Sequence, residues 1–114
     1  ELDDVDINPL KQNIIVFDDF VCDKDQKMME DLFMQGCHKN CSVIYLSQSY
    51  YKTPKNIRLN CTHYCLFETT KRDADLVCGD HSLTDYKSAF QKQYDFLYLD
   101  KPRKWLRRNF DEHL

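Results

Sequence analysis

The run from Ile14 to Asp19, IIVFDD, limits the fold of this chain more than any other stretch. Its consecutive apolar residues favour extended structure and leave neither side of a strand polar, which predicts a strand at Asn13–Phe17 that is buried on both faces. Strands of this kind lie in parallel sheets with helices on each side. The run therefore predicts an α/β fold in which Asp18 and Asp19 follow the carboxyl end of a central strand.

The remainder of the sequence alternates between helix and strand signals, as that fold requires. Capping residues and apolar periodicity predict helices at Lys24–Gln35, Pro54–Leu59, Lys71–Cys78 (ended by Gly79) and Leu83–Gln93 (begun by Ser82). Strands are predicted at Ser42–Ser47, Thr62–Phe67, Phe96–Leu99 and Lys104–Arg107, the last two flanking the turn signal Asp100-Lys101-Pro102. We expect residues 1–12, which are acidic and contain Pro9, to form an extended lead-in.

The composition indicates a folded piece of an α/β domain. Of the 114 residues, 42% are hydrophobic and 13% aromatic, which is enough for a core but for at most one domain. No apolar run approaches the roughly 20 residues of a membrane-spanning helix, and the first residues do not form a secretory leader, so we expect a soluble, cytoplasmic protein with no membrane partner. The net charge of −3 gives no general attraction to nucleic acid.

Two adjacent carboxylates after a buried strand are typical of a Walker B motif, which holds Mg²⁺ and prepares the attacking water for nucleotide hydrolysis. By position, Asp18 is the predicted partner of Mg²⁺ and Asp19 the predicted catalytic base. Gln48 closes the next strand, and a glutamine there can contact both the γ-phosphate and the attacking water. If the two strands are parallel neighbours, all three side chains share one sheet edge. The alternative is ordinary turn chemistry, because Asp commonly caps turns and a loop Gln needs no function.

The usual partner of a Walker B strand, a loop of the form G-x-x-x-x-G-K-[ST], is missing from this sequence. Its two glycines, Gly36 and Gly79, are far apart, and neither precedes a Lys-Ser or Lys-Thr pair. Half of a nucleotide site is therefore missing from these 114 residues, and we expect no ATP turnover by the chain alone.

From about Asn13 onward, the order of segments resembles the poxvirus-type genome-packaging ATPases of the FtsK/HerA superfamily, which also occur in other large DNA viruses and in Maverick/Polinton transposons. The segments that carry the resemblance are IIVFDDF, GCHKNCSVIYLSQS, PKNIRLN, CTHYCLF and FLYLDKPRKWLRRNF. The resemblance implies that residues 13–114 are the C-terminal half of an ASCE-type P-loop domain without its P-loop strand. That strand would lie between Ser42–Ser47 and Thr62–Phe67.

The resemblance also implies roles for individual residues in binding and hydrolysing ATP with Mg²⁺. It makes Asp18 the Mg²⁺-associated carboxylate, Asp19 the catalytic acidic residue and Gln48 the sensor. Arg58, in the IRLN stretch, is a candidate contact for a phosphate or for a neighbouring subunit, although a structural salt bridge would also explain it. Cys37 stands where the superfamily often has an arginine, which puts arginine catalysis between subunits in doubt.

The implied partners are the missing N-terminal half of the domain, further copies in a homo-oligomeric ring, and double-stranded DNA. The basic residues that would contact the DNA are Lys101, Arg103, Lys104, Arg107 and Arg108. The alternative is that these residues form a solvated strand edge around Trp105. A viral protein of this kind would act in a cytoplasmic virus factory or in the virion.

Two other interpretations stay open. The pairs Cys37/Cys41 and Cys61/Cys65 could bind zinc in a small zinc-stabilised domain. Their spacing is wider than that of a zinc knuckle, however, so zinc is the less favoured explanation, and buried free thiols or disulfides also account for the cysteines. Alternatively, the chain is a degenerate, non-catalytic derivative of the ATPase that serves as an interaction module.

Overall fold

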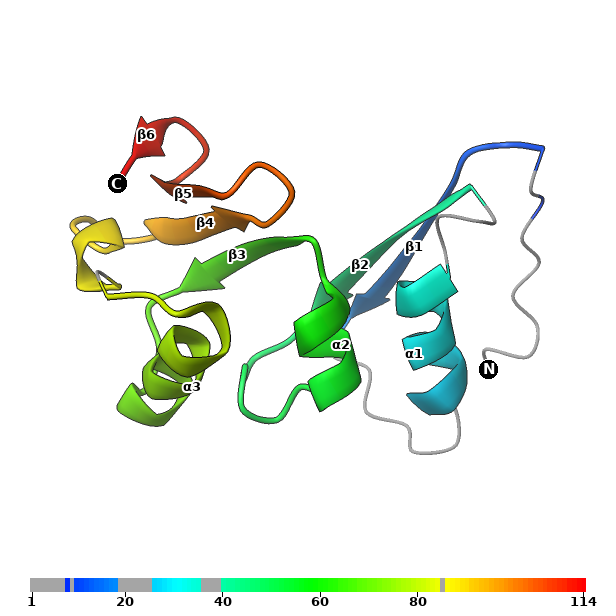
Figure 1. The fold of residues 1–114 in the computed structure, drawn as a ribbon, viewed down its shortest axis with the longest axis horizontal. Coiled ribbons are helices and arrows are strands. Elements are labelled where there is room, and N and C mark those ends of the chain that lie inside the picture. Colours follow the sequence, from blue (N-terminus) through cyan, green and yellow to red (C-terminus); the bar gives the residue numbers. More distant parts are fainter. Residues whose placement is uncertain (1–7, 9, 19–25, 36–39, 85) are drawn as a thin grey trace. The chain divides into compact units, whose positions relative to one another are not determined.

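The computed structural model describes residues 8, 10–18, 26–35, 40–84 and 86–114 (Figure 1). The chain forms two compact units, the first made of residues 1–48 and 53–60 and the second of residues 49–52 and 61–114. The backbone therefore passes from one unit to the other directly after Gln48. No helix among the described residues is long and apolar enough to span a membrane.

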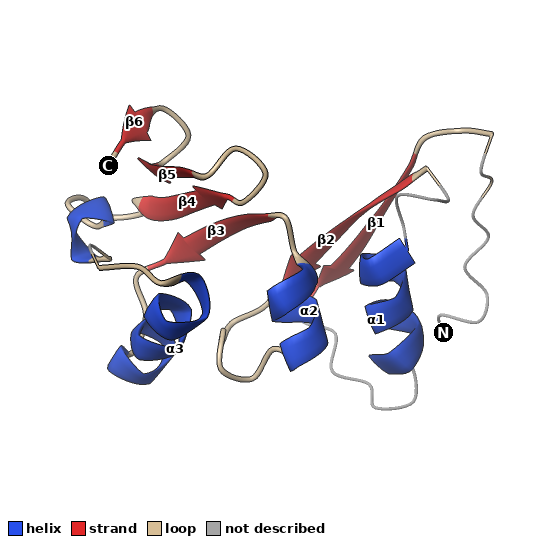
Figure 2. Cartoon of the chain, in the orientation of Figure 1, coloured by secondary structure: helices blue, strands red, loops and turns tan. Residues whose placement is uncertain are grey.

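The first unit alternates strands and helices (Figure 2). Its elements are β1 (Asn13–Asp18), α1 (Gln26–Gln35), β2 (Cys41–Leu46) and α2 (Lys55–Asn60). They confirm the predicted strands and helices, with ends shifted by a single residue; Lys24 and Asp25 of the predicted first helix lie outside the described residues. β1 and β2 pair in parallel, with Asn13 opposite Cys41 and Asp18 opposite Leu46.

The core of the first unit lies on one face of the β1–β2 pair. Phe17 of β1, Met29 of α1 and Ile57 of α2 are almost fully buried. Phe33 of α1 meets Tyr45 of β2 edge-on, with ring centroids 6.1 Å apart. Within the described part of the chain, the other face leaves apolar side chains exposed: Ile14, Val16, Ile44 and Leu46. The predicted burial of β1 is thus met on one face only among the described residues.

The second unit is an antiparallel sheet with one α-helix. Its elements are β3 (His63–Phe67), α3 (Lys71–His81), the short 3-10 helix η3 (Lys87–Ala89), β4 (Phe96–Asp100), β5 (Trp105–Arg108) and β6 (Glu112–His113). The strand order is β3-β4-β5-β6. The two predicted terminal strands are confirmed and pair as the β4–β5 hairpin, whereas β6 was not predicted. β3 pairs with β4 antiparallel, unlike the parallel sheet that the sequence predicts.

α3 ends later than predicted. Gly79 was expected to stop the helix, but it has no positive φ and stays helical. Ser82 instead takes the left-handed conformation, with φ of 54°, and the backbone N–H of Leu83 reaches the Cys78 carbonyl at 3.1 Å. Ser82 therefore ends α3 and does not begin another helix, because the helix-ending conformation falls three residues beyond the glycine.

The predicted helix Leu83–Gln93 is wrong, since η3 is the only helical turn there among the described residues. Leu83, Tyr86 and Phe90 pack individually on a core cluster formed with Val77 and Leu97. Their recurrence at three and four residues reflects burial of an irregular segment, which the sequence pattern alone does not distinguish from a helix.

A buried carboxylate joins the segment after β2 to the start of α3 within the second unit. Asp73 is 3% exposed and accepts hydrogen bonds from the Tyr51 backbone N–H (2.8 Å), the Thr69 hydroxyl (2.9 Å) and the Ser49 hydroxyl (3.3 Å). Burial alone would raise the pKa of Asp73, but these hydrogen bonds outweigh burial and hold the pKa below its ordinary value. The ionised carboxylate therefore fixes residues 49–52 to α3.

Leu97→Ala should destabilise the second unit, because Leu97 has no exposed surface and sits at the centre of the cluster between α3 and the sheet. A buried Leu→Ala change costs about 2–5 kcal/mol. Urea unfolding followed by circular dichroism measures the loss. The matched control is Leu114→Ala, since Leu114 is 41% exposed and should change the free energy of unfolding by less than about 1 kcal/mol. Equal losses in the two variants would contradict this core.

Asp73→Asn should lower the free energy of unfolding by about 2 kcal/mol at neutral pH, because a neutral amide replaces a buried charge that accepts several hydrogen bonds. The folded pKa of Asp73 is lowered, so its stabilisation is complete above the ordinary value of 3.8 and is lost as the pH falls through the folded value. The variant has no carboxyl group at this position to take up a proton. It should therefore lose less free energy of unfolding than wild type when the pH falls through the folded pKa of Asp73. Asp75→Asn, at an exposed position of the same helix, is the control and should behave like wild type.

Candidate functional site

The parallel pairing of β1 and β2 defines the candidate site. Asp18 is the last residue of β1, is exposed, and lies opposite Leu46, the last residue of β2. Gln48 follows Leu46 by two residues and is also exposed. Parallel strands that end in register place the residues after them at one edge of the sheet. The structure therefore brings Asp18 and Gln48 to the same edge, as the sequence predicts. Asp19 lies outside the described residues.

Gln48 sits between two residues that are each held in place. Before it, the Thr53 hydroxyl donates a hydrogen bond of 3.1 Å to the Ser47 hydroxyl within the first unit, and Thr53 is itself buried. After it, Ser49 donates to the buried Asp73 carboxylate within the second unit. Both chain neighbours of Gln48 therefore take part in side-chain hydrogen bonds, one within each unit.

Sequence reasoning missed both anchors. It assigned no role to Thr53 and predicted Ser47 only as the end of a strand. For Asp73 a signal was present, because Thr70 and Asp73 have the spacing of a helix capping box: the Thr70 side chain accepts from the Asp73 backbone N–H at 3.4 Å. That pattern predicts the helix start but not the segment that the carboxylate binds from elsewhere in the chain.

Oxygen ligands at this edge fit a hydrated Mg²⁺. Mg²⁺ prefers carboxylate, phosphate and water oxygens and usually keeps several of its waters, so one or two protein oxygens are enough. The Asp18 carboxylate at the end of β1 and the Gln48 amide carbonyl after the end of β2 supply such oxygens at the same edge of the sheet. Among the described residues, no three His, Cys, Asp or Glu side chains gather closely enough to form a metal cage of protein ligands alone.

Arg58, the remaining predicted site residue, lies in the last turn of α2 and is partly buried. α2 belongs to the first unit, where the neighbouring Asn56 side chain donates to the Glu30 carboxylate of α1 at 3.2 Å. A contact of Arg58 with a phosphate or with another subunit stays a prediction.

The cysteines do not assemble into a four-thiol site in the described part of the chain. Cys41 is buried in the first unit, whereas Cys61 and Cys65 belong to the second, and Cys37 lies outside the described residues. In the described part of the chain, Cys41, Cys61 and Cys65 form no disulfide. Burial raises the pKa of the Cys61 thiol to about 11, with the Lys101 charge acting in the opposite direction.

The predicted basic cluster divides between different roles. The Arg108 side chain is 17% exposed; its guanidinium donates to the Ser88 carbonyl at 2.6 Å and pairs with Glu112. Lys101 lies over the Tyr64 ring, 5.3 Å from its centroid. Arg103 pairs with the buried Asp100 carboxylate at 3.1 Å. These residues therefore do not form one continuous solvated strip, and Arg108 serves chiefly to fix β5 against the segment that contains η3.

Comparison with known protein families gives a match over most of the chain. The family model described as Poxvirus A32 protein matches residues 6–105 of the chain. Neither the comparison with curated proteins nor the comparison with solved structures found a match. The matched stretch contains β1, β2 and the edge that carries Asp18 and Gln48. Because it spans most of the 114 residues, the chain belongs to the poxvirus A32 family, the family of the poxvirus packaging ATPase.

Proposed function

We propose that this chain carries the Mg²⁺-binding and water-activating half of an ATPase that moves viral DNA into capsids. The observation that carries the proposal is the parallel β1–β2 pair, which brings Asp18 and Gln48 to one edge in a chain of the packaging ATPase family. The resemblance to FtsK/HerA enzymes and a partial ASCE-type P-loop fold belong to this proposal. Such an enzyme would act at a cytoplasmic virus factory or in the virion.

Each residue at the edge has a distinct task in the proposed reaction. Asp18 would hold Mg²⁺ at this edge, and the bound ion would neutralise charge on the phosphates. Asp19, next along the chain, takes the proton of the attacking water. Gln48 donates its amide N–H to a γ-phosphate oxygen and accepts a hydrogen bond from the same water. Its position between two anchored serines supports this sensing role.

The exposed apolar face of the β1–β2 pair supports the idea that these strands belong to a larger sheet. Val16 is 53% exposed and Ile44, opposite it in the register, is 46% exposed. Parallel strands are normally covered on both faces, so this face suits further helices and strands of a P-loop domain. The proposed covering partner is the N-terminal half, and the proposed assembly is a ring of copies around double-stranded DNA.

The proposal needs a phosphate-binding loop that the two glycines of these 114 residues cannot provide. The isolated chain should therefore show no ATP hydrolysis above background. A phosphate-release assay with ATP and Mg²⁺ measures this directly. Hydrolysis that Asp19→Asn abolishes would contradict the need for a separate loop, because the chain would then possess a complete site.

The gene product expressed with the sequence encoded upstream of Glu1 should hydrolyse ATP. There, Asp19→Asn should lower the turnover number about a hundredfold or more, since removal of a general base commonly costs that factor. Asp18→Asn should raise the Mg²⁺ concentration needed for half-maximal rate. Asp31→Asn, at an exposed position of α1, is the matched control and should leave both quantities unchanged. Absence of nucleotide binding in this longer protein would favour the non-catalytic derivative instead.

A further inference from the structure

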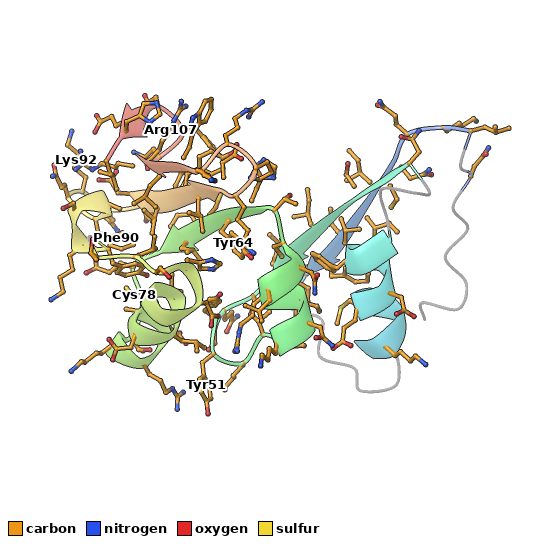
Figure 3. All side chains as sticks on the ribbon, viewed as in Figure 1. Tyr51, Tyr64, Cys78, Phe90, Lys92 and Arg107 are labelled. Atoms are coloured by element: carbon orange, nitrogen blue, oxygen red, sulfur yellow. The ribbon has the colours of Figure 1, made fainter. Side chains whose placement is uncertain are left out.

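The antiparallel sheet of the second unit has two chemically different faces. On one face, Leu66, Leu97 and Leu106 pack toward the core cluster that contains Val77 of α3. Side chains alternate along a strand, so the intervening residues point the other way. Figure 3 shows Phe90 on the side of the sheet that α3 covers and Arg107 on β5, away from α3. We call the second face the aromatic face and define it by the rings Phe67, Phe96, Tyr98, Trp105 and Phe110.

The aromatic face forms a continuous row of rings. The centroids of Phe67 and Phe96 are 5.4 Å apart, those of Phe96 and Phe110 are 4.8 Å apart, and those of Tyr98 and Phe110 are 5.2 Å apart. Phe67, at one end of this row, is 55% exposed, and Phe110, which lies between Phe96 and Tyr98, is 60% exposed. Large aromatic rings that cluster on a surface without being buried there mark a binding site more often than they stabilise a fold.

Positive charge lies beside the exposed rings. The guanidinium carbon of Arg107 is 4.0 Å from the centroid of Trp105, and that of Arg103 is 4.9 Å from it. Trp105 therefore holds two cations through cation–π contacts. The register places Trp105 opposite Asp100 and Arg107 opposite Tyr98, so both lie on the aromatic face.

The acidic group on this face is already neutralised. Asp100 has no exposed surface and pairs with Arg103 at 3.1 Å and with the His63 ring at 3.4 Å. Arg107 also contacts the His113 ring nitrogen at 2.9 Å. The aromatic face therefore presents flat rings next to cationic groups, and its carboxylate is withdrawn from solvent.

Rings with exposed π-faces beside guanidinium groups match the chemistry of a nucleic-acid strand whose bases are unpaired. Its bases stack on aromatic rings and its phosphates attract arginine. A duplex lacks the first contact, because its bases already stack on one another. An acidic peptide would satisfy the charges but would leave the rings without partners. We propose that the aromatic face binds single-stranded nucleic acid, with bases stacked on Phe67 and Phe110 and phosphates held near Arg103 and Arg107.

This surface shares no residue with the proposed ATP site, so its test needs no nucleotide hydrolysis. The probe is a fluorescent oligodeoxythymidylate of about 15 nucleotides, which does not pair with itself, and the readout is fluorescence anisotropy with the full 114-residue chain. Wild type should bind this strand more tightly than a duplex of the same length. Oligouridylate as a second probe distinguishes RNA from DNA, and a preference for either strand supports the proposal.

Phe110→Leu and Phe67→Leu should each weaken binding about tenfold, because leucine keeps the apolar volume but removes the flat ring. Both positions are exposed, and two independent positions keep the test decisive if one variant folds poorly. The matched control is Tyr51→Leu. Tyr51 is also half-exposed and also lies against an arginine, with the Arg72 guanidinium 4.2 Å from its centroid, but it is remote from the sheet strands in sequence and belongs to the segment fixed by Asp73.

Arg107→Gln should weaken binding and reduce the slope of log affinity against log salt by about one, as expected for the loss of one phosphate contact. Arg72→Gln is its control and should leave the slope unchanged. The proposal is overturned if wild type does not bind the single strand, if the Tyr51 and Arg72 variants lose as much affinity as the others, or if duplex DNA binds equally well and Phe110→Leu has no effect. Concentration-dependent self-association that Phe110→Leu abolishes, without any strand binding, would assign this face to a second copy instead.

Discussion

The parallel pairing of β1 and β2 is the constraint on which the candidate site depends. Parallel strands cannot be joined by a tight turn, so the chain must leave the end of β1 and return to the start of β2 through a crossover, which here contains α1. Only this arrangement places the carboxyl ends of both strands at the same edge of the sheet. An antiparallel pair made from the same residues would separate Asp18 from Gln48 by the length of the strands, and no shared site would exist.

A second constraint is the buried Asp73 carboxylate. It collects hydrogen bonds from a backbone amide and two hydroxyls, and so links the segment directly after Gln48 to the first turn of α3. An ionised side chain is tolerated in so enclosed a position because donors surround it. The residue that follows the proposed sensor is thereby tied to a different unit from the strand that precedes it.

Local patterns were enough to predict most elements. They failed where buried residues of an irregular segment have the spacing of a helix. The apolar run of β1 and the apolar periodicity of α1 act over a few residues, so their signals survive in the sequence. Leu83, Tyr86 and Phe90 have helical spacing yet enter the core from an irregular segment. The predicted end of α3 at Gly79 was wrong for a different reason. A glycine permits a helix to end, but α3 ends where the backbone takes a left-handed conformation, at Ser82.

The sequence by itself determined that β1 is an apolar strand delivering Asp18 and Asp19 to its end, that Gln48 follows the next strand, and that no glycine-rich phosphate loop lies within these residues. Tertiary structure decided which strands pair. It made β1 and β2 parallel and set β3 antiparallel to β4, which turned Phe67 and Phe96 into neighbours on one face. The physical reason is that side-chain periodicity is local, whereas the choice of a strand's partner depends on residues far away in the chain.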